Sequence, residues 1–139
     1  MHYSRLDAQT IVSGQIAAGD VAGLVEQGVT MIVNNRPDGE EVGQPPSSEI
    51  AAAAAAAGLD YRHIPMGPSG LSPALVEAMS EAMDTANGPI LTYCRSGTRS
   101  TYLWALARVA KGEPPHRIIE QAAAAGYDLT PIQPYLAAR

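Results

Sequence analysis

The fold is decided by one stretch of the chain, an apolar run that ends in a cysteine and a polar loop: Pro89-Ile90-Leu91-Thr92-Tyr93-Cys94-Arg95-Ser96-Gly97-Thr98-Arg99-Ser100. Its first five residues are typical of a buried strand. A helix is expected directly afterwards, from Thr101 to Lys111. A strand, a short loop and a helix in direct succession form the unit on which the rest of the fold is arranged.

Similar strands and helices alternate on both sides of this unit. Apolar runs predict strands at residues 10–14, 30–34 and 61–65. Helices are expected at residues 20–27, 47–57, 72–86, 115–125 and 130–138. Gly28 and Gly58 are typical residues just after a helix, and Pro73 is favoured at the first helical position. This alternation predicts an α/β fold with a central, mostly parallel sheet flanked by helices.

Length and charge narrow the possible functions. At 139 residues the chain is expected to form a single domain over residues 1–139. A net charge of -5 argues against a nucleic-acid or acidic-membrane partner, because either would require a basic surface. The start of the chain lacks the apolar core of a secretory signal, and no apolar run is long enough to span a bilayer. A cytoplasmic protein is expected, and the oligomeric state cannot be inferred from the sequence.

Cys94 is the only cysteine and the centre of the predicted chemistry. A cysteine between a strand and a helix faces free backbone N–H groups and the positive end of the helix dipole, and both favour a thiolate. Arg99 is predicted to clamp an oxyanion, and Ser100 to donate to the sulfur. Gly97 allows the loop to turn its N–H groups inward. Substrate-binding roles are assigned to the loop residues Arg95, Ser96, Gly97 and Thr98.

The alternative for Cys94 is a buried, inert thiol. Two arginines, a glycine and three hydroxyl residues follow it within six positions, whereas an inert core cysteine is expected among apolar neighbours. This electropositive setting favours the reactive interpretation.

Two residues after the strand at 30–34 are further candidates. Asp38 could protonate a leaving group, although Asp before Gly is also common in turns. Arg36 could reach the crevice at the carboxyl ends of the strands or lie on the surface. For His63, a hydrogen-bonded structural role is favoured over that of a catalytic base. Neither a metal site nor a cofactor is expected, because the histidines and the cysteine lack ligand spacing and no glycine-rich nucleotide motif occurs.

Several separated segments resemble one bacterial family. They are Asn34-Asn35-Arg36-Pro37-Asp38-Gly39-Glu40, Tyr61-Arg62-His63-Ile64-Pro65, the Cys94 loop and the helices after it. Together they resemble the beta-lactamase hydrolase-like phosphatase-like family, whose fold is similar to dual-specificity phosphatases. The resemblance implies a cysteine-phosphatase-like hydrolase with Cys94 as nucleophile, Arg99 as oxyanion clamp and Ser100 as leaving-group helper.

The length of the Cys94 loop supports a different enzyme. Only four residues separate Cys94 from Arg99, one fewer than in classical phosphatase loops. The length and sequence of this loop resemble those of the rhodanese sulfurtransferases. The loop at 66–70, where such phosphatases usually carry the general acid, has no carboxylate. Three hypotheses therefore stay open: a hydrolase acting on a phosphomonoester, a persulfide sulfurtransferase acting on sulfane sulfur, and a low-activity anion-binding or sulfur-relay module.

Overall fold

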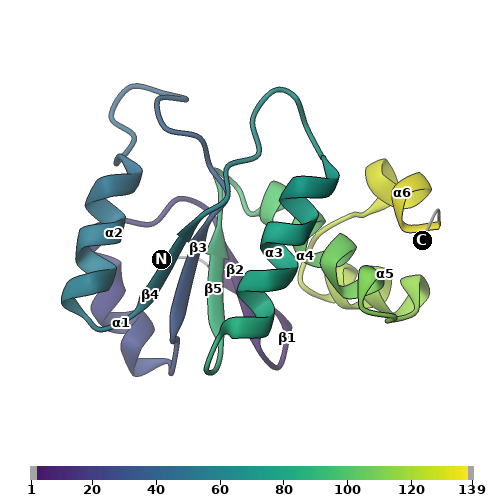
Figure 1. Cartoon of the computed structure of the whole chain (residues 1–139), viewed down its shortest axis with the longest axis horizontal. Helices are drawn as coiled ribbons and strands as arrows, with labels where there is room; N and C mark the ends of the chain where they lie inside the picture. The colour runs from purple at the N-terminus through teal and green to yellow at the C-terminus, as the bar shows by residue number, and fades with distance from the viewer. Residues whose placement is uncertain (1–2, 138–139) are drawn as a thin grey trace.

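Five strands form one sheet in the computed structural model of the chain, which describes residues 3–137 (Figure 1). They are β1 (Tyr3–Asp7), β2 (Thr10–Ser13), β3 (Met31–Asn34), β4 (Asp60–His63) and β5 (Ile90–Tyr93), in the spatial order β1-β2-β5-β3-β4. Strands β2, β5, β3 and β4 are mutually parallel, whereas β1 pairs antiparallel with β2. The predicted α/β fold with a mostly parallel sheet is confirmed.

The helices follow the predicted positions with one informative difference. They are α1 (Val21–Glu26), α2 (Ser47–Ala56), α3 (Pro73–Thr85), α4 (Thr98–Ala110), α5 (Pro115–Ala124) and α6 (Gln133–Ala137), with 3-10 turns η1 (Ala18–Asp20) and η2 (Thr130–Ile132). Helix α4 begins three residues before the predicted start, because the backbone N–H of Thr101 already donates to Gly97 O at 2.9 Å. The polar residues Thr98–Ser100 carry no apolar periodicity that would have indicated this first turn.

Helices cover both faces of the sheet. In Figure 1, α1 and α2 lie on one side, and α3, α4, α5 and α6 lie on the other. Side chains of a strand alternate between the two faces. In β5, Leu91 joins the cluster under α1 and α2, and its neighbour Ile90 joins the larger cluster under α3, α4 and α5. The buried strands thus separate two apolar cores.

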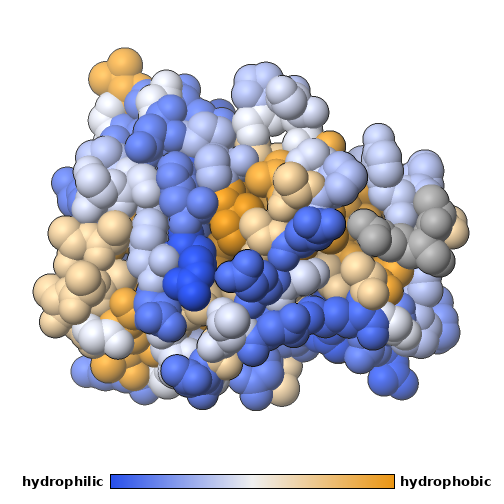
Figure 2. Space-filling model, viewed as in Figure 1, coloured by the Kyte–Doolittle hydropathy of each residue, from blue (hydrophilic) through white to orange (hydrophobic). Residues whose placement is uncertain are grey.

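The larger core is formed in part by long side chains of α3 and α4. Trp104 and Met79 are fully buried, and Met83 packs against the same cluster. On the face seen in Figure 2, hydrophilic residues dominate, and apolar residues reach the surface between β4 and α3 and again at the left, over α2. Within residues 3–137, no helix is both long and apolar enough to cross a bilayer.

The parallel strands determine where the functional residues gather. Because β2, β3, β4 and β5 run in the same direction, the segments that follow them meet at one edge of the sheet. Those segments begin at Gly14, Asn35, Ile64 and Cys94. In open α/β sheets this carboxyl edge is where ligands bind.

Candidate active site

Cys94 follows β5 directly and its side chain is fully buried. The backbone N–H of Gly97 donates to Cys94 Sγ at 3.1 Å. Gly97 has a φ of +92°, a left-handed conformation that side chains rarely adopt, and it is the N-cap of α4. The sulfur therefore lies at the beginning of a 13-residue helix, where a negative charge is stabilised by the helix dipole and a free N–H group.

The rest of the loop divides into exposed and buried residues. Arg95 and Ser96 are exposed, and the hydroxyl of Ser96 donates to Thr98 Oγ1 at 3.1 Å. The Arg95 side chain is 69% exposed and lies 3.6 Å from Glu41. These side chains thus lie on the outer surface of the loop, where they can meet a substrate as it approaches.

Ser100 is buried and its hydroxyl is already engaged. It donates to Asn35 Oδ1 at 2.7 Å, and Thr92 donates to the same oxygen at 2.6 Å. The amide nitrogen of Asn35 donates to Ile64 O at 3.0 Å, so this one side chain joins the ends of β3, β4 and β5 to α4. A hydroxyl has a single proton, and Ser100 gives it to Asn35 rather than to Cys94. The predicted donation from Ser100 to the sulfur is therefore not made in this structure.

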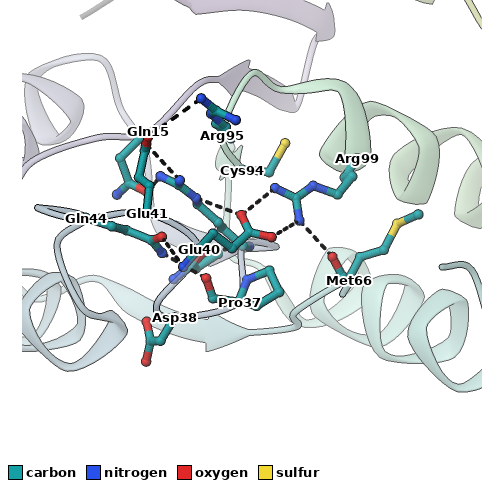
Figure 3. Close-up of polar contacts among 12 residues, drawn as sticks. Gln15, Pro37, Asp38, Glu40, Glu41, Gln44, Met66, Cys94, Arg95 and Arg99 are labelled. Atoms are coloured by element: carbon teal, nitrogen blue, oxygen red, sulfur yellow. Dashed lines mark hydrogen bonds and ion pairs between the residues drawn. The ribbon is translucent and has the colours of Figure 1, made fainter. Parts of the chain in front are cut away.

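Arg99 is held at one end by Glu40, a residue that the sequence did not single out. Nη1 and Nη2 donate to the two Glu40 oxygens at 2.8 Å each, and Nη1 also donates to Met66 O at 2.9 Å. This leaves Nε–H and one hydrogen of Nη2, which form the opposite edge of the guanidinium, without a partner among the described residues. That edge is turned toward Cys94 (Figure 3). Arg99 is thus anchored to Glu40 through Nη1 and Nη2, and its Nε–Nη2 edge faces the sulfur of Cys94.

The hydrogen bonds between Glu40 and Arg99 keep both side chains charged. The hydrogen bond from Arg99, with a smaller one from Arg36, outweighs burial and lowers the pKa of Glu40 to about 2. The hydrogen bond with Glu40 raises the pKa of Arg99, and the negative charge of Cys94 adds to this. At neutral pH, Glu40 is therefore a carboxylate and cannot act as a proton donor.

Arg36 lies inside the protein, not on its surface. Its side chain is 1% exposed, and its guanidinium donates to Glu40 at 2.9 Å, Glu41 at 2.9 Å and Gln15 at 3.0 Å. Burial opposes the charge, but the hydrogen bonds with Glu41 and Glu40 outweigh it and raise the pKa of Arg36. Arg36 therefore supports the carboxylate that anchors Arg99.

Asp38 points away from Cys94 (Figure 3). Its Oδ1 accepts a hydrogen bond of 2.8 Å from the backbone N–H of Ser47, the first residue of α2. The carboxylate satisfies one of the free N–H groups at the start of that helix. In this structure Asp38 is consequently a hydrogen-bond acceptor at the start of α2. This contact fits a structural role for Asp38 better than the role of a general acid.

His63 has the structural hydrogen bond that the sequence indicated. Its Nε2 lies 2.9 Å from the backbone oxygen of Arg36, so it links β4 to the segment after β3. No cluster of three or more potential metal ligands occurs in the part of the chain that the structure describes.

Two residues distant in sequence close around the loop. A Cβ on Gly14 would lie 2.7 Å from the backbone oxygen of Arg95, so only glycine fits there without movement. Tyr127, in the connection after α5, donates from its hydroxyl to Ser96 O at 3.1 Å. No local signal in the sequence pointed to Tyr127, because the contact spans 31 positions.

A cavity of about 530 Å³ lies at the other end of the sheet. Thr10 and Ile90, the first residues of β2 and β5, help to line it, together with Arg108 and Lys111. Arg108 pairs with Asp7 and Lys111 with Asp84, so both cations are already neutralised. The cavity is separate from the Cys94 loop, which lies at the carboxyl ends of the same strands.

Comparison with known proteins identifies relatives over most of the chain. A beta-lactamase hydrolase-like protein of Agrobacterium fabrum is 36% identical over 116 residues, which are 84% of this chain and 27% of that protein. A protein of the same description from Xylella fastidiosa Temecula1 is 34% identical over 125 residues, or 89% of this chain and 29% of that protein. The chain thus spans less than a third of the length of these curated relatives.

Solved structures show the same fold. The crystal structure of a candidate phosphatase from Neisseria meningitidis Z2491 superposes with a TM-score of 0.85 at 34% identity, covering 98% of this chain and 97% of that one. Tk-PTP in its active form gives a TM-score of 0.75 at 14% identity, with 98% and 93% covered. PTPMT1 gives 0.70 at 16% identity, with 99% and 98% covered.

These last two similarities establish the fold of the protein tyrosine phosphatases and no more, because the identities are low. The family described as beta-lactamase hydrolase-like protein, phosphatase-like domain, matches residues 3–111, which include every strand of the sheet and the whole Cys94 loop. This chain therefore belongs to that phosphatase-like family.

Proposed function

We propose that this chain is a cysteine-dependent phosphatase-like hydrolase acting on a phosphomonoester through a covalent intermediate on Cys94. The observation that carries the proposal is the geometry around the sulfur. Gly97 N–H donates to Sγ at 3.1 Å at the start of α4, and Arg99 presents a free edge beside it. Family membership and the phosphatase fold support the same conclusion.

The reaction proceeds in two displacements. The Cys94 thiolate attacks phosphorus, the bond from phosphorus to the leaving oxygen breaks, and the electron pair stays on that oxygen. Water then attacks the phosphocysteine, which releases inorganic phosphate and restores the thiolate. In both steps the Nε–Nη2 edge of Arg99 and the N–H groups of the loop bind the equatorial phosphoryl oxygens, where negative charge is concentrated.

Among the described residues, neither of the two carboxylates considered for the role, Asp38 and Glu40, is available to protonate the leaving group. Asp38 accepts a hydrogen bond at the start of α2, and Glu40, with a pKa of about 2, is ionised at neutral pH. A leaving group that needs a proton therefore departs slowly. We propose that the substrate class is a phosphomonoester with an acidic leaving group, such as an aryl or acyl phosphate, rather than an alkyl phosphate.

A second candidate, persulfide sulfur transfer, is favoured by two specific observations. The loop has only four residues between Cys94 and Arg99, which leaves fewer N–H donors for three phosphoryl oxygens. Sulfur transfer also needs no acid: the thiolate takes the outer sulfur of thiosulfate, and sulfite leaves as an anion. The resulting Cys94 persulfide passes that sulfur to cyanide or a thiol, which becomes thiocyanate or a persulfide.

The test is intact-mass measurement after brief exposure to thiosulfate, run beside phosphate release from an aryl phosphate. Because the chain has one cysteine, any sulfur adduct is located at Cys94. Phosphate release without a stable adduct is expected. A gain of about 32 Da that cyanide removes, without phosphate release, would replace the hydrolase by the sulfurtransferase.

Cys94→Ser is expected to abolish either reaction, and activity retained in this variant would remove the central claim.

Asp38→Asn tests whether the Asp38 carboxylate is a structural acceptor or a general acid. Since Asn still accepts the hydrogen bond from Ser47, we expect equal and small effects on aryl and alkyl phosphates. A selective loss with alkyl phosphates would return Asp38 to the role of general acid.

A further inference from the structure

Tyr127 contacts the Cys94 loop from outside the region that the family description matches. It lies 16 residues beyond that region, which ends at Lys111, in the connection between α5 and η2. Its ring is half-buried, and a Cβ on Gly97 would lie 2.2 Å from its hydroxyl oxygen. The C-terminal segment therefore supplies part of the wall around the loop.

The connection holds the tyrosine in place. Gly126 has a φ of +97°, which ends α5 and turns the chain, and the N–H of Tyr127 donates to Ala122 O at 2.9 Å. On its other side, Asp128 Oδ1 accepts from the N–H and the hydroxyl of Thr130 at 2.9 and 2.6 Å. The side chain thus starts from a backbone fixed at both ends.

The hydroxyl of Tyr127 acts on one peptide group of the loop. It donates to Ser96 O at 3.1 Å, and the N–H of Gly97 donates to Cys94 Sγ at the same distance. The oxygen and the N–H belong to the same trans peptide group, so they point in opposite directions. Holding the oxygen toward Tyr127 therefore holds the N–H toward the sulfur.

The opposite orientation of this peptide is sterically open, because Gly97 accepts both signs of φ. A flipped peptide would direct the Ser96 oxygen at Cys94. A thiolate would then lose a hydrogen-bond donor and face the negative end of a dipole. The hydrogen bond from Tyr127 to the Ser96 oxygen favours the productive orientation from the other side of the peptide, whether or not the thiol is ionised.

We infer that Tyr127 is a positioning residue that orients the Ser96–Gly97 peptide so that its N–H stabilises the Cys94 thiolate. The inference rests on the proposed function only in requiring a reactive thiolate, and it holds for phosphoryl or sulfur transfer alike. Burial, and then the charge of Cys94, raise the pKa of Tyr127, so the phenol keeps its proton at neutral pH and remains a donor to the Ser96 oxygen.

The test is Tyr127→Phe, which keeps the ring and removes the hydroxyl. The charged groups near Cys94 are Arg99 with its partner Glu40, and the outward Arg95, and the substitution leaves all three in place. The pH dependence of Cys94 alkylation by iodoacetamide is expected to move about one unit upward, which makes alkylation below the midpoint about tenfold slower. Tyr135→Phe, at an exposed tyrosine of α6, is the matched control.

A second measurement reports the peptide directly. In NMR spectra of the wild-type protein, the chemical shift of the Gly97 amide is expected to change with pH as Cys94 titrates. In Tyr127→Phe this change is expected to become smaller. The melting temperature of the variant is expected to stay within a few degrees of the wild-type value. An unchanged alkylation profile and Gly97 titration in Tyr127→Phe would overturn the inference. If wild-type Cys94 reacted no faster than a free cysteine, the proposed function would fail first and the inference with it.

Discussion

Glu40 provides the sharpest test of how the site is built. The substitution Glu40→Gln keeps the shape of the side chain but replaces one of its oxygens by an NH₂ group. Glu40 now accepts two hydrogen bonds from Arg99 and one from Arg36, whereas an amide places donors opposite donors. At least one of the contacts that anchor Arg99 is therefore lost, and the free edge of its guanidinium is no longer held toward Cys94.

The magnitude follows from the exposure of the pair. A hydrogen bond between charged groups contributes roughly 1.5–3 kcal/mol when buried. The two side chains are 27% and 23% exposed, so the lower end of that range applies. About 1.5 kcal/mol lost from the transition state corresponds to a decrease of about tenfold in kcat/KM. The assay is turnover of an aryl phosphate, or of thiosulfate if sulfur transfer is the activity found.

Glu41→Gln is the matched control. Glu41 contacts Arg36 and Arg95 but not Arg99, so its loss is expected to leave kcat/KM nearly unchanged. Equal turnover in the Glu40 and Glu41 variants would refute the claim that Glu40 anchors Arg99 for the reaction.

Stability gives an independent measure of the same carboxylate. Because the pKa of Glu40 falls from 4.5 to about 2 on folding, its stabilisation is complete above pH 4.5 and is lost as pH falls toward 2. The full shift is worth at most ~3.4 kcal/mol, and partial exposure reduces this to roughly 1–2 kcal/mol. Urea unfolding at pH 6 and pH 3 is expected to show the difference between wild type and Glu40→Gln falling by more than half. If the difference in unfolding free energy between wild type and Glu40→Gln were the same at pH 6 and pH 3, the ionised Glu40 carboxylate would not be its source.

Two further substitutions test features at the edge of the site. Asp38→Ala removes the acceptor at the start of α2 and is expected to cost about 1 kcal/mol in the free energy of unfolding with little change in turnover; a large loss of turnover at unchanged stability would show a chemical role. Gly14→Ala brings a methyl group to within 2.7 Å of the Arg95 oxygen, so we expect the loop to shift and Cys94 alkylation to slow by at least several-fold, and an unaltered alkylation rate would show that the loop accommodates the methyl group.

Periodicity and turn chemistry were sufficient to predict most of the fold. The four parallel strands and their helices lie within a few residues of their expected positions, because each combines a clear apolar pattern with a glycine or proline boundary. Strand β1 was not predicted, since only Leu6 in it is buried and its apolar pattern is weak. The first turn of α4 was also missed, because its residues are all polar and carry no apolar pattern.

The local geometry of the candidate site was predictable where its residues are continuous in sequence. The sequence of the Cys94 loop indicated an anion-binding turn at the start of a helix, and the structure gives it that geometry. Glu40, Asn35 and Tyr127 were missed, because their importance comes from contacts across 59, 65 and 31 positions. Arg36 could not be assigned from sequence alone, since a buried arginine depends on the two carboxylates that fold around it.

The contacts of Asn35 determine which parts of this chain can change independently. Its amide joins β3, β5, α4 and the segment after β4 from inside the protein, whereas residues 42–46 and 67–71 lie outside that network and outside the side-chain contacts of Glu40 and Glu41. Insertions or replacements there can change the surface around the Cys94 loop while Cys94, Asn35 and Arg99 keep their contacts. We expect such changes to alter which molecules can reach Cys94 without altering the contacts that Asn35 makes behind it.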